Sequence, residues 1–147
     1  MTAIAFHFNA PDKLAYACRL LRKAVGSGAK VVVLASADDV ARLDTQLWTF
    51  NALEFIAHCR ADSAPEVLAQ SPVVLATELS TSLPHHDVLV HLGQSMPQGF
   101  EAFARVIDVV SLDETDRQLA RQRWKRYTEL GYTLLRHDLN LRETAAG

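Results

Sequence analysis

The first fifty residues alternate short apolar runs with amphipathic stretches. Ala3–Asn9 alternates apolar side chains with others, which predicts a strand. Pro11 and Asp12 suit the first turn of a helix that continues to about Val25. Gly26 and Gly28 then end this helix. Its apolar stripe, with a spacing of three or four residues, consists of Leu14, Cys18, Leu21 and Val25.

The same order of elements follows once more. Lys30–Ser36 is a continuous, β-branched apolar run, which is typical of a strand buried on both faces. Ser36 can cap a second helix that ends near Trp48, and Asp38 and Asp39 would lie in its first turn. Strand, helix, strand and helix in this order predict an α/β domain with parallel strands.

The pattern is less regular in the middle of the chain. A short helix is predicted at Pro97–Arg105, and a longer one is expected to start at Thr115 or Asp116 and run to about Leu130. The tail from Arg136 is polar and is expected to fray. The remaining strands are predicted at Glu54–Ala57, within an irregular connection over Phe50–Glu66, and at Pro72–Glu78, Asp87–Gly93 and Val106–Ser111.

Composition is that of an ordinary globular domain. Hydrophobic residues make up 49% and charged residues 22%, and the formal net charge is −2. A chain of 147 residues is expected to form one domain, residues 1–147. Neither a membrane span nor a signal peptide is expected. Cys18 and Cys59 lack a CxxC spacing, so free thiols in the cytoplasm are predicted.

Charge is distributed unevenly. Residues Arg117–Tyr132, "RQLARQRWKRYTELGY", contain five basic residues and one acidic residue, a formal charge of +4. At about 100° per residue, Arg117, Arg121 and Lys125 form one stripe of a helix, with Trp124 at its border. Such a stripe could be a solvated face, a site for single-stranded nucleic acid, or a site for a small acidic target.

The opposite side of this helix is predicted to face the core. Its apolar arc consists of Leu119, Ala120, Tyr127 and Leu130. Arg123 falls inside that arc, where its charge would need either an escape to the surface or a buried carboxylate partner.

No catalytic constellation is evident. The glycines of "GSGAKVV" (Gly26–Val32) end a helix and precede a strand, the reverse of a phosphate-binding loop. The histidines are scattered, and His58-Cys59 has no second pair at zinc-site spacing. No cofactor, metal site or enzymatic activity is therefore expected, although an α/β enzyme or nucleotide binder with unrecognised residues stays a third hypothesis.

Two stretches, Arg42–His58 and Asp108–Tyr132, resemble the chi subunit of the bacterial DNA polymerase III holoenzyme. The second reads "DVVSLDETDRQLARQRWKRYTELGY", and the glycine–basic lead into "KVVVLAS" is also similar. The resemblance implies a three-layer Rossmann-like fold, with a mostly parallel central sheet and helices on both faces. The first stretch carries an LDxxLW pattern followed by three further matching residues: Leu43, Asp44, Leu47 and Trp48, then Phe55, Ile56 and His58.

By resemblance, the protein is a non-catalytic replication adaptor. Chi subunits bind the acidic C-terminal tail of single-stranded DNA-binding protein, which ends in an aromatic residue with a free carboxylate. The resemblance implies that Arg121 clamps this carboxylate, that Trp124 and Val110 wall the ring pocket, and that Lys125 and Arg117 attract the upstream aspartates. The alternative is a direct single-stranded nucleic-acid-binding module that uses the Arg117–Tyr132 helix. Thr128 stands where relatives can carry another basic residue, which would shorten the basic ridge.

The resemblance also implies a link to the clamp loader through the psi subunit. The psi contact would involve Trp48, Phe55 and Ile56. Trp48 is predicted at a helix end that leads into an irregular apolar stretch, where an exposed Trp–Phe pair could anchor a partner. The alternative is that all three side chains pack into the core of this protein.

Overall fold

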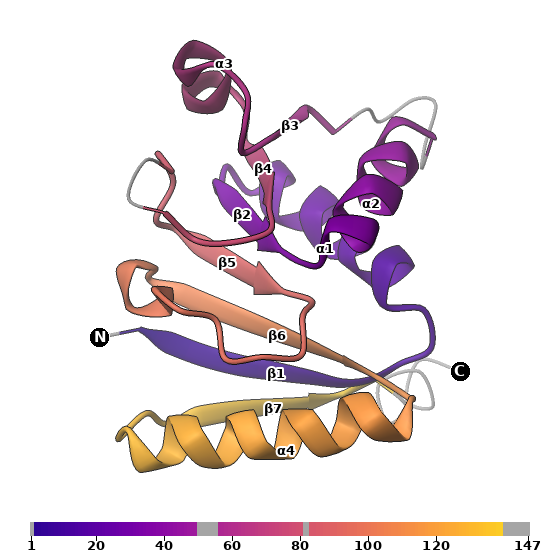
Figure 1. Cartoon of the computed structure of the whole chain (residues 1–147), viewed down its shortest axis with the longest axis vertical. Helices are drawn as coiled ribbons and strands as arrows, with labels where there is room; N and C mark the ends of the chain where they lie inside the picture. Colours follow the sequence, from indigo (N-terminus) through magenta and orange to yellow (C-terminus); the bar gives the residue numbers. More distant parts are fainter. Residues whose placement is uncertain (1, 50–55, 81–82, 140–147) are drawn as a thin grey trace.

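The computed structural model describes residues 2–49, 56–80 and 83–139. Its strands form one sheet in the order β3-β4-β2-β5-β6-β1-β7, and all the neighbouring pairs are parallel (Figure 1). The prediction of an α/β fold with a largely parallel sheet is confirmed. The strands are β1 (Ala3–Ala10), β2 (Val31–Leu34), β3 (His58–Arg60), β4 (Val73–Ala76), β5 (Val88–His91), β6 (Arg105–Ser111) and β7 (Leu134–Asp138).

Helices cover both faces of the sheet, as a parallel sheet requires. One apolar cluster joins the sheet to α1 and α2, through residues such as Leu21 and Leu43. A second cluster lies on the other face and includes Ala120 and Tyr127 of α4 and Phe100. The helices are α1 (Lys13–Gly26), α2 (Ala37–Thr49), α3 (Pro65–Gln70) and α4 (Glu114–Glu129), together with a 3-10 turn, η1 (Phe100–Ala102). The Rossmann-like three-layer arrangement is therefore present.

Local sequence explains where the first two helices begin. The Asp12 carboxylate accepts a hydrogen bond from the backbone N–H of Ala15 at 3.1 Å, and so caps α1. Ser36 caps α2 in the same way, because its hydroxyl accepts from the Asp39 N–H at 3.2 Å. Gly28, two residues after α1, has φ +86°, a conformation that glycine adopts at little cost.

The middle of the chain differs from the prediction. Of the short strand expected at Glu54–Ala57, the first two residues lie outside the described residues, and Ile56 and Ala57 are not in a strand. The strand in this segment, β3, begins at His58 and pairs with β4. A six-residue helix, α3, occupies the segment from Pro65, part of which was assigned to an irregular connection. The helix expected at Pro97–Arg105 is reduced to η1, since Gly99 adopts φ +95° and Arg105 already begins β6.

The end of the chain departs most from the prediction. Arg136 does not begin a frayed tail but lies within β7, which pairs in parallel with β1 over Ile4–Phe8. Tertiary pairing with β1 overrides the weak strand propensity of a polar segment. On its other edge β1 pairs with β6, and an irregularity between His7 and Ala10 places Asn9 at φ +66°. Asparagine tolerates this left-handed conformation better than most residues.

Candidate binding pocket

The ends of α4 are fixed by their own side chains and backbone. Asp113 caps the N-terminus, because its carboxylate accepts from the Asp116 N–H at 3.0 Å. The helix thus begins earlier than the predicted Thr115 or Asp116. At the other end, Gly131 has φ +92°, and the Tyr132 N–H donates to the Tyr127 carbonyl, which is a Schellman-type closure. These caps set which residues of α4 face the sheet.

Arg123 is the largest fully buried side chain, with an exposed fraction of 2%. Its Nε and Nη2 donate to the two oxygens of Asp108 on β6, each at 2.9 Å. Its Nη1 donates to the carbonyl of Gln94 at 2.6 Å. His91 lies 3.2 Å from the same carboxylate. The buried carboxylate partner was one of the two alternatives for Arg123, and it fixes the rotation of α4 against the sheet.

Two buried carboxylates, Asp108 on β6 and Asp116 in the first turn of α4, stay ionised. Burial alone would raise the pKa of Asp108, but His91 and Arg123 outweigh this cost and hold that pKa below its ordinary value. Burial likewise opposes ionisation of Asp116, yet the Ser111 N–H and Lys13 lower its pKa. Lys13 Nζ lies 2.9 Å from Asp116 Oδ2, so this pair ties the start of α4 to the start of α1.

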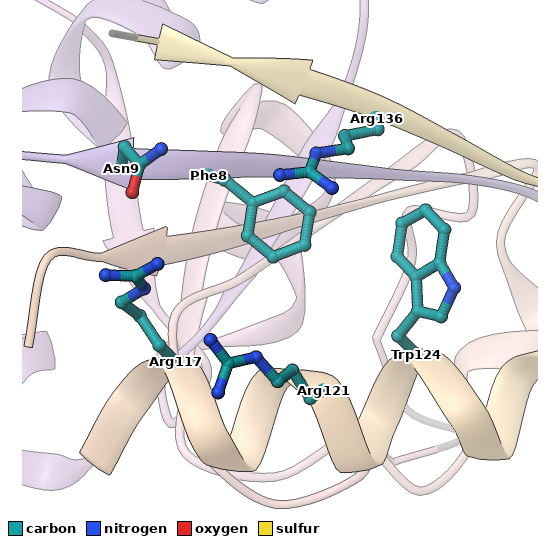
Figure 2. Close-up of a pocket in the computed structure, with 6 residues that line it drawn as sticks. All are labelled: Phe8, Asn9, Arg117, Arg121, Trp124 and Arg136. Carbon is teal, nitrogen blue, oxygen red and sulfur yellow. The ribbon is translucent and has the colours of Figure 1, made fainter. Parts of the chain in front are cut away.

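A pocket of about 210 Å³ lies between α4 and the β1–β7 edge. Arg117 and Arg121 reach into it from α4, and Arg136 reaches in from β7 (Figure 2). Phe8 of β1 lies between these arginines, and Trp124 stands beside it on the α4 side. The described residues that line it are Phe8, Asn9, Arg117, Arg121, Trp124 and Arg136.

Aromatic packing makes the apolar wall rigid. The Trp124 ring packs edge-on against Phe6, with centroids 5.1 Å apart, and lies 6.0 Å from Phe8. Phe6 and Phe8 stack at 5.6 Å. Trp124 and Phe8 are both half-buried, so each keeps one part of its ring on the core and another part toward the pocket. A flat apolar guest could stack here without a large rearrangement.

The three arginines are only weakly engaged. The Arg136 guanidinium lies 5.0 Å above the Phe8 ring, a cation–π contact. Arg117 and Arg121 each approach Glu114, at 3.9 and 3.7 Å, on the exposed surface. Exposed ion pairs of this length contribute little and can be exchanged for a ligand's carboxylate. No carboxylate belongs to the described residues that line the pocket, so these residues present an excess of positive charge.

The structure brings together only part of the predicted site. Arg117, Arg121 and Trp124 line the pocket, whereas Lys125 is exposed on α4 one turn beyond Arg121 and lies outside the lining. Val110 has an exposed fraction of 0% and belongs to the core cluster on the α4 face, so it does not form an open wall. Phe8 occupies the wall position instead.

Three residues that line the pocket were not predicted from the sequence. Phe8 shares a face with Ile4 and Phe6 through the two-residue period of β1, and this period could have indicated its position beside α4. The position of Asn9 in the lining depends on the irregularity in β1, and that of Arg136 depends on the formation of β7. No local sequence pattern predicts either feature. The predicted core arc of α4 also needs one correction, since Leu130 is 44% exposed at the helix end.

The second predicted surface lies at the end of α2. Trp48 is 63% exposed, the largest exposed fraction among the big hydrophobic side chains described. Its ring lies 5.5 Å from His58, whose Nε2 is 2.8 Å from Asp44 Oδ1. Ile56 is only 4% exposed and packs in the α1–α2 core cluster. Phe55 lies outside the described residues.

The described ranges contain no group of three or more His, Cys, Asp or Glu side chains placed to hold a metal ion. Cys18 and Cys59 are both free and buried, and burial raises the pKa of Cys18 to about 11. None of the helices in these ranges is long and apolar enough to span a bilayer.

Comparison with known proteins decides the family. The family described as "DNA polymerase III chi subunit, HolC" matches residues 1–135. The chain belongs to the DNA polymerase III chi subunit family. It is 36% identical over 129 residues to the DNA polymerase III subunit chi of Pseudomonas aeruginosa, covering 86% of this chain and 87% of that protein. Identity to the Escherichia coli DNA polymerase III subunit chi is 31% over 118 residues, covering 80% and 79%.

The match to the chi family includes both stretches on which the resemblance rested, and it extends through α4 into β7. The relatives are named as subunits of a DNA polymerase, so the chain is placed among the proteins of DNA replication.

Proposed function

We propose that this chi-family chain is a non-catalytic adaptor whose α4 pocket binds the acidic C-terminal tail of single-stranded DNA-binding protein. The observation that carries the proposal is the convergence of Arg117, Arg121 and Arg136 around the Phe8–Trp124 wall. A tail that ends in an aromatic residue offers one ring and one carboxylate at the same point. The pocket offers a wall for the ring and guanidinium groups for the carboxylate.

The chemistry of the lining favours a carboxylate. Arginine presents a planar fork of N–H donors that matches two carboxylate oxygens at once. Arg121 lies between Arg117 and Trp124 on α4, so a carboxylate bound there leaves the ring beside the indole. Arg117 and the exposed Lys125 would then attract aspartates earlier in the tail. Long-range attraction of this kind weakens as salt is added.

The size of the pocket favours a short guest. A volume of about 210 Å³ accommodates one or two side chains rather than a folded partner. Hydrogen bonds to charged groups contribute about 1.5–3 kcal/mol each, so two of them with the buried ring make a micromolar affinity, about −8 kcal/mol, reasonable.

Trp48 is proposed as the anchor of a second contact, with the psi subunit of the clamp loader. The support is its exposure at the end of α2 beside His58, where a large apolar ring faces solvent. Together the two contacts would connect DNA-bound protein with the clamp loader.

A titration with a fluorescent peptide tests the tail-binding proposal. The peptide carries aspartates and ends in phenylalanine with a free carboxylate, and the matched control carries a terminal amide. We expect saturable binding that drops at least about tenfold on amidation, and the free-acid peptide should lose affinity by a similar factor in Arg121→Ala. Equal binding of both peptides would refute the proposal. Oligonucleotide binding at physiological salt, with no peptide binding, would instead support the alternative of a direct single-stranded nucleic-acid module.

A further inference from the structure

A second and larger hollow lies on the opposite face of the sheet, where α1 meets the β1–β7 edge. Its volume is about 590 Å³. Its floor includes Leu20, Val88 and Ile107, which belong to the α1–α2 core cluster or pack against it. Its charged lining comes from α1 and the start of β6, at Arg19, Lys23 and Arg105. We call this hollow the α1 groove.

In the described part of the chain, the groove lies over a part of the sheet that α1 and α2 do not cover, and Leu139, directly after β7, lines its end. α1 packs mainly against α2, β2 and β6, while α4 covers β6 and β7 from the other face. In the described ranges no further helix packs on the α1 side of β1 and β7 (Figure 1). Leu135 of β7 is 60% exposed, and two residues later His137 lines the groove from the same side of the strand. Leu135 therefore adds exposed apolar surface next to the groove, on the same face of β7 as His137.

The groove is positively charged. Arg19 and Lys23 are one turn apart on α1, and they project on the same side of the helix. Within the described residues, neither they nor Arg105 form an ion pair with a carboxylate, and no carboxylate lines the groove. The Arg19 guanidinium lies 5.7 Å from the Tyr16 ring centre, at the edge of the hollow. In a chain of net charge −2, this is a local excess.

We propose that the α1 groove binds an amphipathic helix of a partner protein that carries carboxylates along one border of its apolar face. The apolar face would pack on Leu20, Ile107 and Leu135, and the carboxylates would meet Arg19, Lys23 and Arg105. A helix fits because, in a three-layer α/β fold, the position beside a helix on the sheet is the place of another helix. Docking of an apolar helix face into a groove is a common recognition mode.

The proposal is independent of the tail pocket. The two sites use opposite faces of the sheet, since Phe8 and Arg136 face α4 whereas Ile107 and His137 face α1. The apolar floor separates this groove from a simple anion site, because a phosphate or nucleotide gains nothing from an exposed leucine on β7. The charged rim in turn selects acidic helices over neutral ones.

Peptide selection with the full chain tests the proposal. The bait carries Arg121→Ala, so that the tail pocket does not dominate, and the probe is a phage-displayed library of short random peptides. Enriched peptides are synthesised, and their affinity for the bait is measured by fluorescence anisotropy. The same bait is prepared with Arg19→Glu and Lys23→Glu together, with Leu135→Asp, and, as the matched control, with Arg22→Glu, an exposed α1 residue outside the groove.

We expect enriched peptides with apolar residues spaced three and four apart, flanked by Asp or Glu, that gain helical circular dichroism on binding. Charge reversal at Arg19 and Lys23 should weaken them at least about tenfold, Leu135→Asp should also weaken them, and Arg22→Glu should leave them unchanged. Peptides without acidic residues, or equal binding to all variants, would overturn the proposal. Displacement by inorganic phosphate together with indifference to Leu135→Asp would also overturn it, and would assign the groove to a small anion.

Discussion

Arg123 of α4 and Asp108 of β6 form a two-point ion pair in the interior, with both N–O distances at 2.9 Å. Neither side chain is more than 2% exposed. The pair does not touch the pocket, yet it fixes how α4 is rotated on the sheet. Arg121 and Trp124, its neighbours in sequence, thereby project toward β1 and β7. The proposed tail-binding surface therefore depends on an ion pair buried in the core.

Removing Arg123 should destabilise the fold strongly. In Arg123→Ala the ionised Asp108 would be left buried with His91 as its remaining side-chain partner. Breaking a buried pair by removing one partner costs about 3–5 kcal/mol. Urea unfolding followed by circular dichroism measures the loss, and Arg126→Ala on the exposed side of α4 is the matched control. A loss below about 1 kcal/mol would show that the pair contributes little to the fold.

Acid should unfold the protein through its buried carboxylates. The pKa values of Asp108 and Asp116 are lowered in the folded state. Each carboxylate therefore stabilises the fold above its unfolded pKa of about 3.9, and this stabilisation is lost as the pH falls through the lowered folded-state value. The urea midpoint should fall steeply below about pH 4. Asp116→Asn should lower stability at pH 7 and flatten this fall; an unchanged slope would contradict the assignment.

Arg136 should contribute to tail binding although β7 was not expected. It faces Phe8 across the pocket from Arg121 and adds a third guanidinium group to the lining. Because Arg136 is exposed, we expect Arg136→Ala to weaken the peptide by roughly fivefold, about 1 kcal/mol. Anisotropy titration at low salt measures this change. Arg126→Ala serves as the control, and equal effects of both variants would indicate only a loss of general positive charge.

Trp48→Ala should abolish co-purification with psi while the domain stays folded. Trp48 is 63% exposed, so its removal should change stability by less than about 0.5 kcal/mol. Val67→Ala, at another exposed apolar position, should leave co-purification intact. Ile56 is unsuitable for this test because it is buried, and its truncation would damage the core. Persistent co-purification in Trp48→Ala would place the psi contact elsewhere.

Much of the fold could be predicted from the sequence because the patterns that indicate its helices and strands lie within single segments. The period of α1, the continuous apolar run of β2 and the basic stripe of α4 each predict their own environment, and Arg117, Arg121 and Trp124 do meet in the pocket. Arg136 could not be found this way, since its strand exists through pairing with β1. Val110 was predicted from the family resemblance alone, which identifies positions but not whether a side chain lines an open surface. Lys125 was predicted from the helical stripe, which identifies a face of α4 but not which of its residues reach the pocket.

The position of Arg123 could also be predicted from local sequence, but its partner could not. Placing Arg123 on a helical wheel revealed a cation in an apolar arc, but the wheel cannot name a partner on another element. Asp108 is fifteen residues away in sequence and is buried at the same point because β6 leads directly into α4. Long-range contacts of this kind need the fold.

The most direct test of the account is a double-mutant cycle between Arg121 and the terminal carboxylate of the tail peptide. Binding is measured for the wild-type chain and Arg121→Ala, each with the free-acid and the amidated peptide. If Arg121 holds the carboxylate, the two changes are not additive, and the coupling energy should be about 1.5–3 kcal/mol. Additive losses, with a coupling within about 0.3–0.5 kcal/mol of zero, would mean that Arg121 does not hold the carboxylate and would contradict the central claim.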